Sequence, residues 1–144
     1  MLFVHESVIP APVERVFAFH ERPDALRRLL PPFRKAEVVQ APASLAPPSR
    51  AVIRLRVAPL VWVTWIAEHT AFVRGEMFRD EQVSGPFRHW VHTHLFRAAP
   101  GGTLLRDEID CQPPCGALAE PLVRRQLRRV FEYRHEVTRA ACAS

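Results

Sequence analysis

The chain has 144 residues, of which 48% are hydrophobic and 24% are charged, a composition that predicts one globular domain over residues 1–144. Its apolar runs are too short to cross a bilayer and its first residues lack a signal-peptide pattern, so we expect a cytoplasmic protein without stable membrane insertion. Although the net charge is +5, the arginines are spread along the chain without aromatic interleaving, so we expect no nucleic-acid binding.

The N-terminal part of the chain predicts a strand, two short helices and a second, shorter strand. Residues 3–9 alternate between apolar and polar side chains, as a strand does. Pro12 then fits the first turn of a helix, and Asp24 can cap a second helix that ends at the double proline 31–32. The segment 36–40 favours a short strand, and a proline-rich loop follows it.

The centre of the chain predicts five longer strands that are joined by short turns. Short links indicate antiparallel neighbours, because parallel strands need long crossover connections. The glycine-rich turn before the last strand is typical of a hairpin. The predicted strands cover residues 51–58, 60–72, 77–83, 87–96 and 103–112.

The C-terminal segment predicts one long amphipathic helix over about residues 117–140. Apolar side chains recur at helical spacing on one side, and Arg134 continues the same row. The other members of this row are Val123, Leu127, Val130 and Val137. We therefore predict an α+β architecture in which a curved antiparallel sheet of about six to seven strands wraps around this helix.

A cavity is expected between the curved sheet and the helix, because a curved surface and a straight cylinder do not meet everywhere. The alternation of side chains along the strands indicates which of them face this space. They form too polar a set for a dry core. The predicted inward set is Trp65, His69, Phe78, Asp80, Gln82, Trp90, His92, His94 and Asp107.

The stretch GPFRHWVHTH contains three histidines, and the same alternation separates them. Trp90, His92 and His94 share the inward face of the predicted strand. Phe87 and His89 lie on the opposite, outward face. Two of the three histidines are therefore candidates for the cavity wall.

Each inward histidine has a predicted carboxylate partner on a neighbouring strand. The turns allow registers that set Asp80 opposite His92 and Asp107 opposite His94, and buried polar groups need such partners. Each imidazole would present one nitrogen to its carboxylate and leave the other free for an oxygen of a ligand. Removing either histidine should leave a carboxylate unpaired and cost roughly 1–3 kcal/mol of stability, together with affinity. No partner is evident for His5, His20 and His135.

A mononuclear metal site is a different use of the same residues. His92 and His94 form a pair two residues apart on a strand, and Asp80 or Asp107 would be the third ligand. A carboxylate partner for each histidine accounts for both rings without an ion. The three cysteines also lack zinc-binding spacing. We therefore expect no metal and no other cofactor.

The order of the elements resembles the START/polyketide cyclase-dehydrase/pathogenesis-related (SRPBCC) superfamily. The segments IPAPVERVFAF, FRDEQVSGPFRHWVHTHLF, GGTLLRDEIDC and VRRQLRRVFEYRHEV carry the resemblance, which covers nearly the whole chain and points to a bacterial ligand-binding branch. It implies the helix-grip fold and a hydrophobic cavity beneath the long helix. Members of this branch are sometimes fused to a sugar-epimerase-like reductase, which implies a functional link to such an enzyme. The resemblance implies no catalytic set.

These residues are compatible with two functions. The first, which we favour, is the binding, with transport or sequestration, of a small hydrophobic ligand such as a lipid, quinone, isoprenoid or polyketide. The second is a cyclase- or dehydratase-type enzyme that uses a His–Asp pair as general acid or base. Its candidate catalytic residues are His92, His94, Asp80 and Asp107. Binding is favoured because a paired, buried histidine is more often structural than catalytic. The oligomeric state, a homodimer included, is left open.

Overall fold

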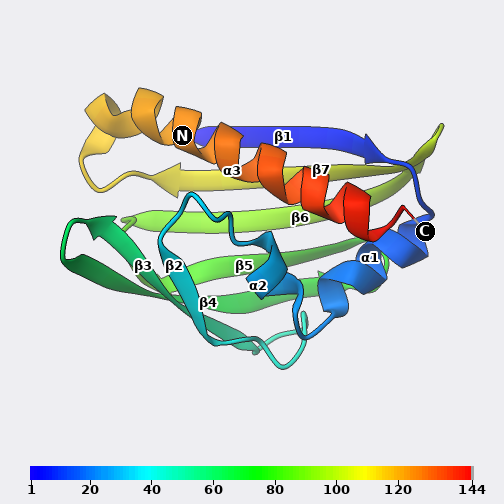
Figure 1. Cartoon of the computed structure of the whole chain (residues 1–144), viewed down its shortest axis with the longest axis horizontal. Helices are drawn as coiled ribbons and strands as arrows, with labels where there is room; N and C mark the ends of the chain where they lie inside the picture. Colours follow the sequence, from blue (N-terminus) through cyan, green and yellow to red (C-terminus); the bar gives the residue numbers. More distant parts are fainter. Residues whose placement is uncertain (144) are drawn as a thin grey trace.

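The structure is a computed structural model that describes residues 1–143, and these residues form seven strands and three α-helices (Figure 1). The strands are β1 (Leu2–Ile9), β2 (Ala36–Gln40), β3 (Arg50–Ala58), β4 (Val61–Val73), β5 (Met77–Ser84), β6 (His89–Ala99) and β7 (Gly102–Gln112). The helices are α1 (Val13–Glu21), α2 (Ala25–Leu29) and α3 (Glu120–Ala141), with a 3₁₀ turn at Gly116–Ala119 before α3.

All seven strands belong to one antiparallel sheet with the order β1-β7-β6-β5-β4-β3-β2. The strands from β2 to β7 form a meander, as the short turns predict. β1 pairs with β7, so that Leu2 lies opposite Asp110 and Ile9 opposite Thr103. The predicted α+β helix-grip fold is confirmed, including the number of strands and the two short helices after β1.

The turn between β6 and β7 depends on glycine. Gly102 has a φ of 144°, and a Cβ atom at this position would lie 2.0 Å from the carbonyl oxygen of Ile9. Only glycine allows this backbone to pass so close to the end of β1. The turn therefore also fixes where β1 meets β7.

The long helix α3 covers the sheet on the side of β1 and β7, and it contacts β1 along its length (Figure 1). Its buried side chains are spaced three or four residues apart, so they form one stripe. They are Leu127, Phe131, His135 and Thr138. The helix begins later than predicted because residues 116–119 form the 3₁₀ turn. None of the helices in the described part of the chain is long and apolar enough to cross a membrane.

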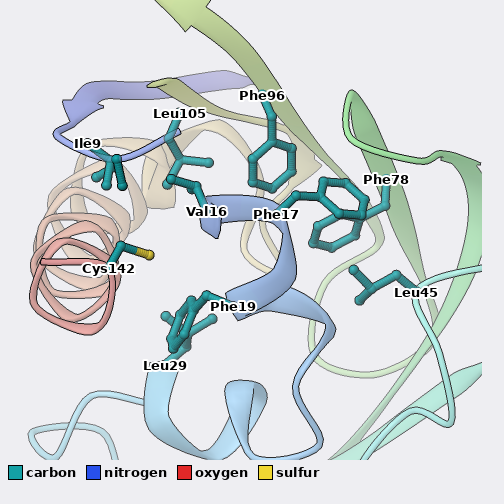
Figure 2. Packing of buried hydrophobic residues seen from close by; sticks show 11 residues of the cluster. Ile9, Val16, Phe17, Phe19, Leu29, Leu45, Phe78, Phe96, Leu105 and Cys142 are labelled. Atoms are coloured by element: carbon teal, nitrogen blue, oxygen red, sulfur yellow. The ribbon is translucent and has the colours of Figure 1, made fainter. Parts of the chain in front are cut away.

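Two clusters of buried apolar residues join the helices to the sheet. In the first, α1 inserts Val16, Phe17 and Phe19 against the sheet, and the rings of Phe17 and Phe96 lie 4.9 Å apart in an edge-to-face arrangement (Figure 2). The second cluster lies beneath α3. It contains Phe3, Trp90, Ile109, Cys111, Leu127 and Phe131. The clusters anchor the helices and leave open space between them and the central strands.

The predicted cap of α2 is wrong. The carboxylate of Asp24 makes no capping hydrogen bond; it accepts hydrogen bonds of 2.9 and 3.0 Å from the guanidinium of Arg22. The two nitrogens of an arginine match the two oxygens of a carboxylate, and here this arrangement replaces the cap. The helix is only five residues long and ends at Leu29, before the double proline.

Candidate functional site

A cavity of about 400 Å³ lies between the central strands, α2 and α3. This volume falls within the range of roughly 300–1,000 Å³ that is typical of small-ligand sites. Most of its wall is apolar. The sheet contributes Ile53, Leu55, Trp65, Ala67, Phe78 and Trp90, and the helices contribute Leu26, Leu29, Leu127, Val130 and Phe131. Such a wall suits a ligand with an apolar body.

Seven of the nine side chains predicted to face inward line this cavity. They are Trp65, His69, Phe78, Asp80, Trp90, His92 and His94. Asp107 lies behind the two histidines instead of at the surface of the cavity, and it is almost fully buried. Gln82 lies outside the lining as well. The alternation of side chains thus identifies the inward face, but it does not say how deep each residue lies.

The strand registers agree with the prediction. Asp80 is opposite His92 between β5 and β6, and His94 is opposite Asp107 between β6 and β7. The two imidazoles lie against each other, with ring centroids 3.7 Å apart. Phe78 stacks on the outer face of His94 at 3.8 Å. This stack fixes the orientation of both rings.

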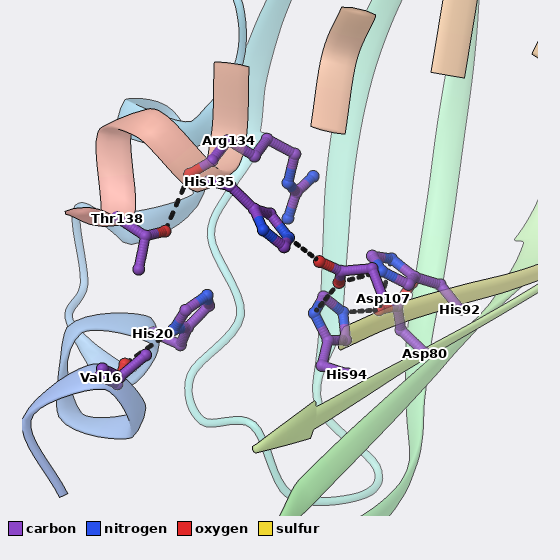
Figure 3. Close-up of polar contacts among 9 residues, drawn as sticks. All are labelled: Val16, His20, Asp80, His92, His94, Asp107, Arg134, His135 and Thr138. Carbon is purple, nitrogen blue, oxygen red and sulfur yellow. Dashed lines mark hydrogen bonds and ion pairs between the residues drawn. The ribbon is translucent and has the colours of Figure 1, made fainter. Parts of the chain in front are cut away.

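The hydrogen bonds cross between these pairs (Figure 3). His92 donates from Nε2 to Asp107 at 2.7 Å, and its Nδ1 stays 3.8 Å from Asp80. His94 contacts both carboxylates, with Nε2 3.1 Å from Asp80 and Nδ1 3.1 Å from Asp107. The expectation of one free nitrogen on each ring is therefore wrong for His94. Of these two rings, His92 is the one that keeps a nitrogen, Nδ1, without a hydrogen-bond partner among residues 1–143.

His135 on α3 completes the cluster, although no partner for it was predicted. Its Nε2 lies 2.7 Å from the second oxygen of Asp107, and its Nδ1 lies 2.6 Å from the hydroxyl of Ser7 on β1. Asp107 thus holds three imidazoles and links the helix to the sheet. The position four residues after Phe131, on the buried stripe, is the sequence signal that could have identified His135.

The protonation states of the two stacked rings differ. Burial, followed by the neighbouring His94, lowers the pKa of His92 to about 4, so this ring is neutral near pH 7. Burial also opposes the charge of His94, but its contacts with Asp107 and Asp80 prevail and raise its pKa above the usual value. The pKa of Asp107 lies well below its usual range, because hydrogen bonds from three imidazoles outweigh burial.

Phe87 and His20 are two of the lining side chains that were not predicted there. Phe87 was assigned to the outward face, but it precedes the first residue of β6, so strand alternation does not apply to it. Its ring centroid lies 5.6 Å from that of Trp65. His20 reaches the wall from α1 and donates from Nδ1 to the carbonyl of Val16 at 2.9 Å. Burial lowers the pKa of His20 to about 3.

The side chain of Gln82 holds the turn between β5 and β6. Its amide nitrogen donates to the carbonyl of Phe87 at 2.7 Å, and its oxygen accepts from the amide of Phe87 at 3.1 Å. We expect Gln82→Ala to lower the free energy of unfolding by about 1–3 kcal/mol, because two backbone groups lose their partner. Urea denaturation would measure this loss. A Gln82→Ala protein as stable as the wild type would contradict this structural role.

The same groups are also the ones that could hold a metal ion. Asp80, His92 and His94 each offer one ligand atom, and these atoms lie within 4.8 Å of one another. In the structure, the contacts of His94 with both carboxylates and the bond from His92 to Asp107 satisfy these groups as a hydrogen-bonded network. These hydrogen bonds within the protein therefore explain the positions of Asp80, His92 and His94.

Comparison with known proteins gives one family match and many similar structures. The model of the family described as "Polyketide cyclase / dehydrase and lipid transport" matches residues 9–134. No curated protein matches the chain.

Among solved structures, a nucleoside-diphosphate sugar epimerase from Corynebacterium glutamicum has a TM-score of 0.78 and is 26% identical. The match covers 96% of this chain and 28% of that protein, so the chain spans less than a third of its length. Protein CV1439 from Chromobacterium violaceum has a TM-score of 0.76 with 15% identity, over 99% of this chain and 97% of that one. Ara h 8.0201 has a TM-score of 0.68 with 14% identity, over 100% and 99%. The last two likenesses show the fold.

Proposed function

Because the chain belongs to the polyketide cyclase/dehydrase and lipid transport family, we propose that it binds a small hydrophobic ligand, such as a lipid, quinone, isoprenoid or polyketide, in the cavity beneath α3. The observation that carries the proposal is the cavity of about 400 Å³, whose wall is mostly aromatic and aliphatic and whose polar groups gather on β5 and β6. The apolar body of a ligand would gain free energy by leaving water, and the polar groups would orient its head.

The residues that we propose for ligand contact divide into two kinds. Trp65, Trp90 and Phe78 supply apolar walls, and the rings of Trp65 and Trp90 pack edge to face with centroids 4.9 Å apart. His92 supplies its Nδ1 atom, which has no hydrogen-bond partner among residues 1–143. The remaining proposed contacts are His69, Asp80 and His94. Asp107 contacts His92 and His94 from the side away from the cavity, and Gln82 holds the turn between β5 and β6.

A cavity-filling substitution tests the proposal directly. Ala67 on β4 lines the cavity. We expect Ala67→Phe to weaken binding of the uncharged fluorescent probe N-phenyl-1-naphthylamine at least about tenfold, because the new ring occupies the space of the ligand. Fluorescence titration would measure the affinity. Native mass spectrometry and organic extraction of the purified wild type would identify any copurifying ligand.

The matched control is Thr64→Phe, on the same strand. Thr64 is exposed and lies outside the cavity lining, so the same added ring should leave probe affinity unchanged. If the wild type binds neither the probe nor any extractable apolar molecule, the proposed function fails.

An enzymatic function of the cyclase or dehydratase type is the second candidate. The observation that favours it is His92, a neutral imidazole with one nitrogen on Asp107 and the other without a hydrogen-bond partner among residues 1–143. Such a ring can accept a proton while the carboxylate stabilises the resulting charge. An enzyme would convert the extracted ligand with a pH profile that is lost in His92→Ala. A binding protein would return the ligand unchanged.

The partner that we propose besides the ligand is an epimerase-like reductase. In the protein from Corynebacterium glutamicum, the region similar to this chain is 28% of one longer polypeptide. Light scattering on mixtures of this chain with such a reductase would detect a complex, and it would also give the chain's own oligomeric state, a homodimer included.

A further inference from the structure

The charged residues of the cavity wall are mostly arginines. Arg22, Arg34, Arg56 and Arg134 line the cavity, and Asp80 is the carboxylate among the lining residues. Arg22 is paired with Asp24. The other three guanidinium groups have no hydrogen-bond or ion-pair partner within residues 1–143. The potential that a ligand meets inside the cavity therefore favours negative charge.

Arg134 is the arginine that reaches the polar side of the cavity. It lies on α3, where its guanidinium carbon is 5.1 Å from the centre of the Phe131 ring. Figure 3 shows the side chain extending from the helix toward the sheet, beside His135, without a dashed contact to any carboxylate. Contact with the aromatic face limits the motion of the guanidinium and leaves its N–H donors available.

The two buried carboxylates do not serve as partners of Arg134. Asp107 already accepts hydrogen bonds from His92 and His135, and Asp80 accepts one from His94. Neither is within ion-pair distance of the guanidinium, so their attraction to it acts only at longer range. A partly buried guanidinium without an acceptor carries a desolvation cost, and an anionic ligand would offset that cost.

We propose that Arg134 receives the acid group of the ligand, and that the ligands of this cavity are amphipathic carboxylic acids with one apolar body. This inference rests on the proposed function, because it requires that the cavity binds a ligand. The planar guanidinium matches the two oxygens of a carboxylate, and charge-assisted hydrogen bonds are stronger than neutral ones. The aromatic walls would hold the chain or ring system.

His69 is a further polar side chain of the cavity wall. It lines the cavity, its residue is only 6% exposed, and its Nδ1 is a buried atom without a hydrogen-bond partner in the described part of the chain. Native proteins rarely leave such an atom unsatisfied. Since this atom is not accessible to solvent, a ligand in the cavity would not reach it, and the acid group of the ligand is assigned to Arg134 alone.

The test compares an acid with the matching alcohol. Dodecanoic acid and dodecan-1-ol would each displace N-phenyl-1-naphthylamine from the wild type, from Arg134→Gln and from Arg134→Lys. We expect the wild type to bind the acid at least about tenfold more tightly than the alcohol. Arg134→Gln should lose this preference while its alcohol affinity stays within about threefold. Arg134→Lys, which keeps the charge but not the paired donors, should retain part of the preference.

Arg128→Gln is the matched control, because Arg128 is an exposed arginine of the same helix and lies outside the cavity lining. It should keep the wild-type preference. A purely structural role of Arg134 would change both affinities together and leave their ratio intact, which would overturn the inference. Equal affinities of the wild type for the acid and the alcohol would also overturn the inference. So would a failure of the acid to displace the bound probe. Both outcomes are measured on the wild type, so they hold even if Arg134→Gln does not fold. Failure of the probe itself to bind would refute the proposed function instead.

Discussion

Asp107→Asn should lower the free energy of unfolding by about 3–5 kcal/mol, the cost of removing one member of a buried charged network. The carboxylate lies within 2.7 Å of His92 and of His135 and within 3.1 Å of His94, and the three rings come from two elements. An amide has the same shape but cannot accept hydrogen bonds on both of its ends. Stability of natural domains is only about 5–15 kcal/mol, so this single change removes a large share of it.

Asp110→Asn provides the comparison, since Asp110 lies three residues further along β7 and is exposed. Its contact with His89 is 3.4 Å long and is open to solvent. This variant should stay within about 0.5 kcal/mol of the wild type in urea denaturation. If Asp107→Asn were equally mild, the network would not stabilise the fold.

Acidification from pH 7 to pH 4 should destabilise the protein by several kcal/mol. Burial holds the native pKa of His20 at about 3, and burial together with His94 holds that of His92 at about 4. Between these values and the ordinary 6.5, the unfolded chain binds protons that the native state does not, so stability falls as pH falls. Each unit of pKa difference corresponds to about 1.4 kcal/mol. Asp107, whose native pKa is depressed, adds a loss in the same direction below about pH 4.

His94 acts with the opposite sign. Its native pKa is raised, so its contribution is complete below the ordinary value of 6.5 and is lost as pH rises through the native pKa. Stability should therefore be greatest near neutral pH.

Urea denaturation at a series of pH values would measure how the free energy of unfolding depends on pH. His20→Gln should flatten the acid side of this dependence, because the variant has no buried imidazole at this position to take up a proton on unfolding. An unaltered slope in His20→Gln would contradict this account.

The local periodicity of the sequence was sufficient to predict the inward face of the strands and the register of β5, β6 and β7. Successive side chains there point to opposite faces of the sheet, and a slip of one residue would expose Trp90 and His92 together. The pairing of β1 with β7 was not predicted, because the two strands lie at opposite ends of the sheet-forming sequence. Alternation alone does not say which edge the first strand joins.

The candidate site, too, could be predicted from the sequence only in part. Pairing of neighbouring strands was enough to predict that four side chains lie close together: Asp80, His92, His94 and Asp107. The contact of His135 with Asp107 depends on how α3 is rotated and inclined over the sheet, and several rotations bury an apolar stripe of similar area. The crossed hydrogen bonds depend on ring orientations that follow from stacking on Phe78, which no spacing in the sequence encodes.

The pairing of β1 with β7 also sets the order of events while the chain is being made. β1 leaves the ribosome before the other strands of the sheet, and the strand that it pairs with, β7, ends at Gln112. At roughly 5–20 residues per second, β1 waits several seconds before β7 exists. Until then its backbone donors and acceptors can pair with another nascent chain, and closing so long a loop is slow. The strand of the sheet that is synthesised first is thus paired only after the last strand of the sheet has been translated.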